Sequence, residues 1–157
     1  MFAHARFIFS RLAFGAMMTA KALWSPVALG VHALIIDAEG KVLLARHSYM
    51  MGWSLPGGGV RRGESPLEAL KRELREELGS VKSAEPQFVG MFSRRAGWAT
   101  NVVLLYRLSD ASVAFTPNFE VREIRFVDPK SPPAGTSAGT RRRLAEFANA
   151  APPAPSW

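Results

Sequence analysis

The chain is predicted to fold as one α/β domain, and two features of the sequence support this prediction. Strand-like segments occur on both sides of a strongly capped helix, and a second helix is expected after the last of these strands. At 157 residues the chain has the size of a single domain and can bury roughly two-thirds of its unfolded surface. Pro26 marks the expected start of the domain, which is predicted over residues 26–150.

The first strands are predicted directly after Pro26. Residues 27–37 are rich in β-forming side chains, and the turn at residues 38–40 leads into a second apolar run at 41–46. This order predicts a β-hairpin. Three further strands are expected at residues 86–94, 101–108 and 121–127.

The central helix has clear start and stop signals. Ser65 followed by Pro66 and, three residues after the serine, Glu68 forms a capping box, and Gly79 provides a stop. Leucines 67, 70, 74 and 78 recur at helical spacing and are expected to face the core. A last helix is expected to begin at a cap formed by Ser137 or Thr140 and to run through residue 148.

The two ends of the chain are expected to lie outside the domain core. Residues 1–25 are apolar and basic and are predicted to be helical, but Arg6 and Arg11 interrupt the apolar run, so no transmembrane segment is expected. Docking on protein is favoured over a membrane-surface helix or a weak signal sequence, because the segment is rich in aromatic residues and has few charges. The tail 151–157 contains three prolines and is expected to be mobile.

One face of the central helix is strongly acidic. Glu73, Glu76 and Glu77 stand at i, i+3 and i+4 and therefore project from the same side. Carboxylates so close repel one another, and a hard divalent cation such as Mg²⁺ or Mn²⁺ would offset that repulsion. Taken alone, the pattern is more typical of a solvated acidic face on a surface helix.

The surroundings of the acidic face favour the metal interpretation. A glycine-rich loop at residues 57–59 precedes the helix, and Glu64 lies just before the cap. Together these residues resemble the Nudix box, the signature of the Nudix hydrolase family. Matching positions are Gly58, Glu64, Arg72, Glu73, Leu74, Glu76, Glu77 and Gly79. The final aliphatic position is occupied by Ser80, with Val81 following it, which puts only the packing of this loop in question.

The resemblance implies a fold and a metal-dependent activity. It implies a mixed sheet sandwiched between helices, with the box as a loop–helix–loop motif on one side. The implied activity is hydrolysis of a phosphoanhydride bond, in which Mg²⁺ or Mn²⁺ neutralises phosphate charge and lowers the pKa of water. The implied metal ligands are Glu73, Glu76, Glu77 and the carbonyl of Gly58. Arg72 is expected to orient a ligand carboxylate through charge-assisted hydrogen bonds.

The general base is left open by the sequence. Relatives place it either in the box or in a later loop, so Glu77, Glu64, Glu120 and Glu123 are all candidates. Glu120 resembles the additional acidic residue of many relatives, as an extra ligand or as the base. Glu64 has a competing structural role, since it can accept backbone N–H bonds in the turn before the helix.

The residues expected to bind substrate are Arg46, Trp98 and Arg94. Arg46 precedes the box where relatives often carry a basic residue against phosphate, and Trp98 can stack on a nucleobase. A loop aromatic packed on the core is an equally good interpretation of Trp98. The neighbouring His47 is expected to be an ordinary surface histidine.

Composition narrows the function class without fixing the substrate. The absence of cysteine excludes disulfides and thiolate metal sites and is compatible with a cytoplasmic protein. The net charge of +7 favours anionic partners, although no long basic run or nucleic-acid motif is present. Within the family the chain resembles the ADP-ribose pyrophosphatase-like and general nucleotide branch. That resemblance implies a substrate in which a nucleoside diphosphate is linked to another moiety, as in a nucleotide sugar or ADP-ribose, or a nucleoside triphosphate. The alternative functions are a hydrolase of RNA ends and a catalytically silent nucleotide-binding module. A homodimer is a further hypothesis.

Overall fold

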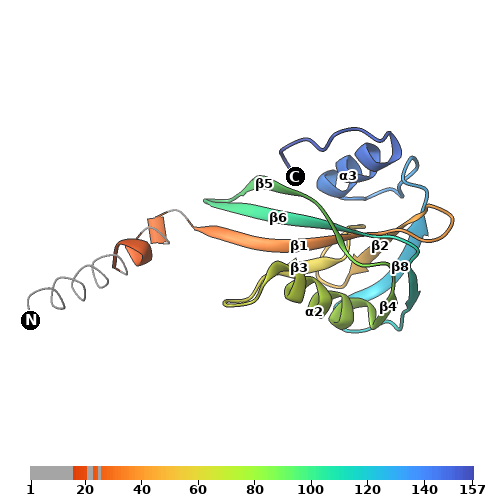
Figure 1. The fold of residues 1–157 in the computed structure, drawn as a ribbon, viewed down its shortest axis with the longest axis horizontal. Helices are drawn as coiled ribbons and strands as arrows, with labels where there is room; N and C mark the ends of the chain where they lie inside the picture. The colour runs from red at the N-terminus through yellow and green to blue at the C-terminus, as the bar shows by residue number, and fades with distance from the viewer. Residues whose placement is uncertain (1–15, 21–22, 25) are drawn as a thin grey trace, which may run out of the picture.

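The computed structural model describes residues 16–20, 23–24 and 26–157 and has the expected α/β fold (Figure 1). The elements in chain order are β1 (Val27–Ile35), β2 (Val42–His47), β3 (Gly57–Gly59), α2 (Pro66–Leu78), β4 (Ser80–Lys82), β5 (Gln87–Ala96), β6 (Ala99–Leu108), β7 (Ser112–Ala114), β8 (Val121–Val127) and α3 (Ala138–Ala148).

The main sheet is mixed, as predicted. Its strand order is β3-β1-β6-β5, in which β1 and β6 run parallel while β3 and β5 pair antiparallel with their neighbours. Two small antiparallel sheets, β2-β8 and β4-β7, complete the fold. The register places His32 of β1 opposite Gly57 of β3, at the point where the glycine-rich segment meets the sheet.

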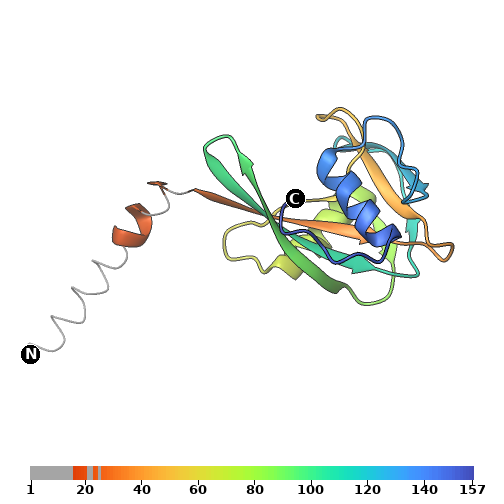
Figure 2. The ribbon, with the colours of Figure 1, turned by 90° about the horizontal axis from the view of Figure 1, so that it is seen from above.

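The helices lie on opposite faces of the main sheet, which confirms the sandwich (Figures 1 and 2). On one face α2 packs Leu70, Leu74 and Leu78 against Val31 and Ile35 of β1. On the other face, the second apolar cluster includes Leu144 of α3 together with Leu34 of β1 and Ile36, which follows the strand. Side chains of β1 therefore contribute to both cores, because successive residues of a strand point to opposite faces.

The predicted hairpin between the first two strands is wrong. Between β1 and β2 only the single bridge between Ile36 and Val42 is formed. The physical reason is that β1 is a central strand, and both of its edges are already occupied by β3 and β6. The second strand instead pairs with β8 and forms a separate sheet.

The structure contains several short strands that the sequence did not predict. The glycine-rich segment 57–59, expected to be a loop, pairs with β1, and the pair β4-β7 is also new. Ser80, which stands where the box pattern has an aliphatic residue, is the first residue of β4 and is exposed. The next residue, Val81, packs against the core beneath α2. Val81 thus supplies the apolar contact that the box pattern places one residue earlier.

The helix caps follow the sequence closely. Ser65 accepts from the backbone N–H of Glu68, and the Glu68 carboxylate accepts from the N–H of Ser65. Gly79 ends α2 with a φ of 75°, a conformation that favours glycine. At α3 the cap is Ser137, which decides between the two candidates. Leu67 is 37% exposed and lies outside the core, in contrast to the other three leucines of its stripe.

The structure describes the C-terminal tail in full and only part of the N-terminal segment. Most of segment 1–25 lies outside the described residues; residues 16–20 and 23–24 are helical and exposed. Within the described part of the chain, no helix has the length and apolar content that crossing a membrane requires. The C-terminal tail, expected to be mobile, is instead attached to the domain: Trp157 stacks on His32 and its backbone N–H donates to Ser93.

Candidate active site

Three carboxylates converge at one end of α2. One oxygen from each of Glu73, Glu77 and Glu120 lies within 4.8 Å of the others, and these three residues are called the acidic cluster below. Glu73 and Glu77 stand one helical turn apart on α2, while Glu120 comes from the loop that precedes β8. Glu77 is almost fully buried, with 1% of its surface exposed, whereas Glu120 is open to solvent.

Both oxygens of Glu77 are held by hydrogen bonds. Its Oε2 accepts from the backbone N–H of Gly57 at 2.8 Å, and its Oε1 lies 2.6 Å from Nε2 of His47. His47 is therefore not the surface histidine that the sequence predicted: it is 4% exposed and its Nδ1 lies 3.2 Å from the hydroxyl of Ser54. The strand pairing of β2 with β8 accounts for this burial, because it places the end of β2 beneath the loop that carries Glu120.

Gly58 lies directly against the acidic cluster. A Cβ atom at this position would stand 2.5–2.6 Å from the carboxyl group of Glu73, so any other residue would require this carboxylate to move. The Gly58 carbonyl oxygen lies 3.2 Å from where a Cβ of Gly30 would be, and so on the β1 side of the strand.

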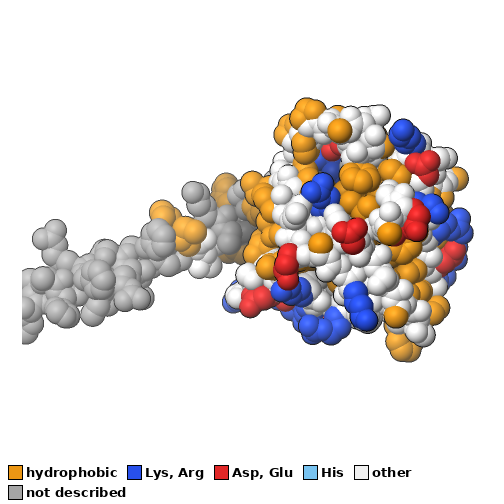
Figure 3. Space-filling view, turned by 45° about the vertical axis from the view of Figure 1, so that its right-hand side comes forward, with side chains coloured by type: hydrophobic (Ala, Val, Ile, Leu, Met, Phe, Trp, Pro, Cys, Tyr) orange, Lys and Arg blue, Asp and Glu red, His pale blue; other side chains and the backbone are white. Residues whose placement is uncertain are grey.

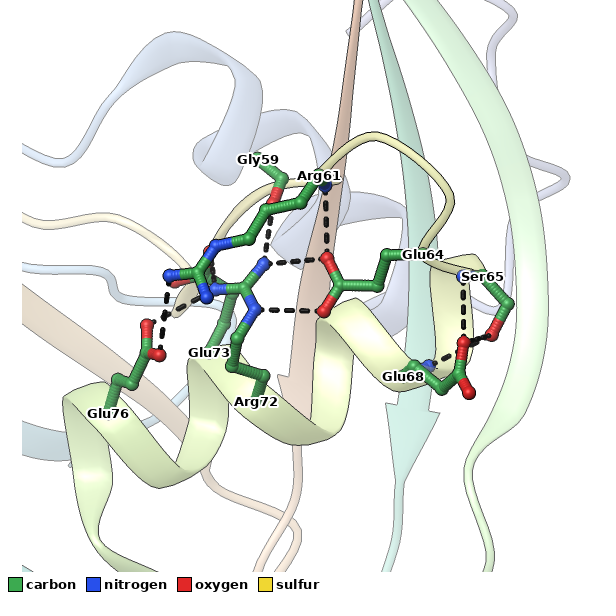
Figure 4. Close-up of polar contacts among 8 residues, drawn as sticks. All are labelled: Gly59, Arg61, Glu64, Ser65, Glu68, Arg72, Glu73 and Glu76. Carbon is green, nitrogen blue, oxygen red and sulfur yellow. Dashed lines mark hydrogen bonds and ion pairs between the residues drawn. The ribbon is translucent and has the colours of Figure 1, made fainter.

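Arg72 connects the glycine-rich loop with the helix (Figure 4). Its guanidinium donates to both oxygens of Glu64, at 2.8 and 2.9 Å, and to the carbonyl of Gly59 at 2.8 Å. The hydrogen bonds from Arg72, together with one from the backbone N–H of Arg61, hold the pKa of Glu64 at about 2. These bonds fit the structural role considered for Glu64, as an anchor of the loop that is ionised at neutral pH.

The same guanidinium also faces the acidic side of α2. Arg72 Nη1 lies 2.6 Å from Glu73 and 3.1 Å from Glu76. Figure 4 shows how these side chains face one another. Burial raises the pKa of Glu73, and the hydrogen bond from Arg72 opposes that rise. The side chain of Glu76 is 39% exposed and is also paired with Arg61 at 3.4 Å. The carboxylate that lies close to both Glu73 and Glu77 is that of Glu120, not that of Glu76.

The loop that carries Glu120 is attached to α2 by Asn118, a residue that the sequence analysis missed. The amide nitrogen of Asn118 donates to the backbone carbonyls of Glu77 and Glu76, at 3.0 and 3.3 Å. Its amide oxygen accepts from the N–H groups of Glu120 and Val121. No sequence signal could have identified this role, because it depends on two segments that meet only in the folded chain.

The predicted substrate residues lie in two separate places. Arg46 forms an ion pair with Glu123 at 2.7 Å and lines a cavity of about 390 Å³ together with Tyr49 and Arg122. His47 also lines this cavity and lies 2.6 Å from Glu77, so the cavity adjoins the acidic cluster. Burial raises the pKa of Tyr49, and the charges of the cluster raise it further.

Trp98 and Arg94 belong to the β5-β6 hairpin. Trp98 is 79% exposed in the turn of this hairpin, and Arg94 pairs with Asn101 across it. Within residues 26–157, no hydrogen bond, ion pair or ring contact connects either side chain with the acidic cluster. Trp98 is therefore neither packed on the core nor in contact with the carboxylates.

The surface charge is mixed on the face presented in Figure 3. Lys and Arg side chains are interspersed there with Asp and Glu and do not form one continuous basic surface. Elsewhere in the molecule, ion pairs such as that of Arg46 with Glu123 also bring the two signs of charge together.

Comparison with known proteins adds to this geometry. A family model described as "NUDIX domain" matches residues 26–147. An RNA pyrophosphohydrolase from Hydrogenovibrio crunogenus is 39% identical over 70 residues, which are 45% of this chain and 40% of that relative, so the match spans less than half of its length.

Solved structures resemble this fold over most of the chain. The MutT NUDIX hydrolase from Burkholderia pseudomallei superposes with a TM-score of 0.67 at 22% identity, covering 77% of this chain and 98% of that protein. The MutT protein from Methanosarcina mazei Go1 gives the same TM-score at 24% identity, covering 80% of this chain and 96% of that protein.

Proposed function

The chain belongs to the Nudix family, and we propose that it hydrolyses the phosphoanhydride bond of a nucleotide-type substrate with the help of a divalent cation. The observation that carries the proposal is the convergence of Glu73, Glu77 and Glu120 within 4.8 Å, beside the backbone of Gly58. Carboxylate oxygens in this number suit a hard cation, and the repulsion among them favours its binding.

Mg²⁺ or Mn²⁺ is the proposed cation. Glu73, Glu77 and Glu120 would hold it, with the Gly58 carbonyl and Glu76 as further candidates from the resemblance to the Nudix box. When bound, such an ion neutralises phosphate charge and lowers the pKa of water. The donor set fits it, since all five groups offer oxygen.

The remaining residues of the box organise these ligands. Arg72 holds Glu73 and, through Glu64, the loop that presents Gly58. Of the candidate bases, Glu64 is unsuited to accept a proton, because its pKa is about 2. Glu123 is paired with Arg46 and Arg125, and both oxygens of Glu77 already accept hydrogen bonds.

Glu120 is therefore the proposed base. Its side chain is exposed, and within the described residues its carboxylate has no hydrogen bond or ion pair of its own. It also lies in the acidic cluster, so it can reach both a bound cation and a nearby water.

The favoured substrate is a nucleoside diphosphate linked to another moiety, such as a nucleotide sugar or ADP-ribose, or a nucleoside triphosphate. The cavity lined by Arg46, Arg122 and Tyr49 supports this choice, because it offers two cations and an aromatic ring beside the acidic cluster. Trp98 and Arg94 would then contact only a part of the substrate that extends toward the β5-β6 hairpin.

RNA ends are the second candidate substrate. The observation in favour is the 39% identity with the RNA pyrophosphohydrolase from Hydrogenovibrio crunogenus over 70 residues. A catalytically silent nucleotide-binding module is the least favoured alternative, because every acidic position of the box is present.

The test is a substrate panel with Mg²⁺ or Mn²⁺: ADP-ribose, nucleotide sugars, nucleoside triphosphates, dinucleoside polyphosphates, and RNA with a 5′-triphosphate or a cap. We expect cleavage of a phosphoanhydride into two phosphate-bearing products, and loss of nearly all turnover in Glu77→Gln with folding intact. Preference for the RNA substrates would select the second candidate. Tight binding of one compound with cleavage of none would favour the silent module.

Two further expectations accompany this function. A cytoplasmic location is proposed because nucleotides are abundant there and the chain contains no cysteine. A homodimer is proposed as the assembly to test by light scattering, because exposed apolar residues such as Leu23, Trp24 and Val27 gather before and at the start of β1.

A further inference from the structure

His47 forms a buried hydrogen bond with the acidic cluster that the Nudix box does not describe. It ends β2, and its Nε2 lies 2.6 Å from Oε1 of Glu77. The two side chains are only 3% and 2% exposed, so water does not compete for this bond. A hydrogen bond in such a shielded place constrains both partners strongly.

For a neutral imidazole, the contacts of His47 determine which ring nitrogen carries the hydrogen. An ionised carboxylate can only accept, so Nε2 must donate to Glu77. In a neutral imidazole Nδ1 is then an acceptor, and the hydroxyl of Ser54 at 3.2 Å is its donor. Ser54 is itself held by two backbone hydrogen bonds with Ala45 of β2, at 2.9 and 3.0 Å.

These contacts make Glu77 the most firmly fixed member of the acidic cluster. One of its oxygens is held by His47 and the other by the N–H of Gly57. Among residues 26–157, the Glu73 carboxylate is held by Arg72 alone, and Glu120 is exposed. Through the hydrogen bonds of Ser54 with His47 and of His47 with Glu77, the position of strand β2 determines the position of the Glu77 carboxylate.

We propose that His47 is a positioning residue: kept as the Nε2–H tautomer by Ser54, it fixes the Glu77 carboxylate toward Glu73 and Glu120 and thereby sets the affinity of the cluster for a divalent cation. The consequence for hydrolysis rests on the proposed function. The consequence for cation binding can be measured without any substrate.

The test compares three substitutions of His47, by Gln, Asn and Leu, in the full-length protein. Gln can place an amide N–H near the position of Nε2, Asn can replace only Nδ1, and Leu removes both. Mn²⁺ affinity is measured by electron paramagnetic resonance, and kcat and KM are measured on the best compound of the substrate panel. The matched control is His32→Gln, a second semi-buried histidine whose Nδ1 contacts the carbonyl of Leu55.

We expect His47→Leu and His47→Asn to weaken Mn²⁺ binding by about 10- to 100-fold, as is typical when the partner of a metal ligand is lost. A loss in kcat of similar size should appear with little change in KM, and His47→Gln should recover most of both. The control should change thermal stability but not Mn²⁺ affinity.

Equal Mn²⁺ affinity in the Gln, Asn and wild-type proteins would overturn the proposal, and this comparison stands even if His47→Leu does not fold. A ¹⁵N NMR spectrum of labelled histidine that places the hydrogen of His47 on Nδ1 would overturn it as well. If the wild-type protein binds Mn²⁺ but cleaves none of the panel, the proposed function fails while the affinity comparison still tests the role of His47.

Discussion

Asn118 links the helix that carries Glu77 to the loop that carries Glu120. Its side-chain amide donates to the carbonyl oxygen of Glu77 at 3.0 Å, and its amide oxygen accepts from the backbone N–H of Glu120 at 2.9 Å. One side chain therefore forms hydrogen bonds with backbone groups of both segments. The distance between the two carboxylates is set by this link as well as by the fold.

Replacing Asn118 by Ala should separate these segments. We expect turnover and Mn²⁺ affinity to fall by about 10-fold, because Glu120 loses its fixed position. The free energy of unfolding should fall by roughly 1 kcal/mol, since the lost hydrogen bonds are partly exposed. The control is Asn149→Ala, which removes a similar amide-to-carbonyl bond at the end of α3 and should cost stability without affecting activity.

Arg72 is expected to tolerate no replacement by lysine. A lysine cannot contact both oxygens of Glu64 while also reaching Glu73 and the carbonyl of Gly59. Turnover of Arg72→Lys should therefore fall by about 10- to 100-fold in a steady-state assay. Arg75→Lys, an exposed position one turn along α2, should behave as wild type. Equal activity of the two variants would contradict the connecting role of Arg72.

The stability of the loop should depend on pH through Glu64. Its pKa lies at about 2 in the folded protein, below the ordinary value of 4.5, because Arg72 and the N–H of Arg61 bind the carboxylate. The folded state thus gains stability above about pH 4.5 that is lost as the pH falls toward 2. In urea titrations, the difference in stability between wild type and Glu64→Gln should be largest near neutral pH and should shrink as the pH falls. A difference that is constant over this range would contradict the assignment.

Arg143 is predicted to be the main attachment of the C-terminal tail. It is 2% exposed, pairs with Glu146 at 2.9 Å, and donates to the carbonyls of Ala154 and Ser156. Its guanidinium also lies 4.0 Å from the centre of the Phe92 ring. Arg143→Ala should lower the free energy of unfolding by about 3 kcal/mol, because buried partners are left unsatisfied.

The exposed neighbour of Arg143 provides the control for this prediction. Arg142 contacts only Ser156 of the tail, and Arg142→Ala should cost less than about 1 kcal/mol in the same denaturation experiment. Cleavage of the tail by a protease should accelerate in Arg143→Ala and not in Arg142→Ala. Similar stability and cleavage in the two variants would show that the tail is held by other contacts.

The sequence predicted those features that are local along the chain. The acidic face of α2 follows from helical spacing, and its ends follow from Ser65 and Gly79, all of which the structure confirms. The family was also predicted correctly, from the Nudix box, and the mixed sheet was an implication of that resemblance. The helix caps and the box each lie within one continuous stretch of residues.

The features that the sequence could not supply depend on how distant segments meet. The hairpin was wrong because the pairing of β1 with both β3 and β6 is not visible in either strand alone. His47 was expected at the surface because nothing near it in sequence indicates that β2 pairs with β8. Asn118 was missed for the same reason, and it was the fold that brought Glu120 to Glu73 and Glu77 in place of Glu76.

The most direct test of the account is the affinity for Mn²⁺ of the wild type and of Glu77→Gln, Glu120→Gln and Glu76→Gln, with Glu85→Gln, an exposed glutamate outside the cluster, as the control. If the acidic cluster holds the cation, the Glu77 and Glu120 variants should each lose at least about 10-fold in affinity. The loss in Glu76→Gln should be smaller, and Glu85→Gln should match the wild type. Unchanged affinity in both Glu77→Gln and Glu120→Gln would contradict the account.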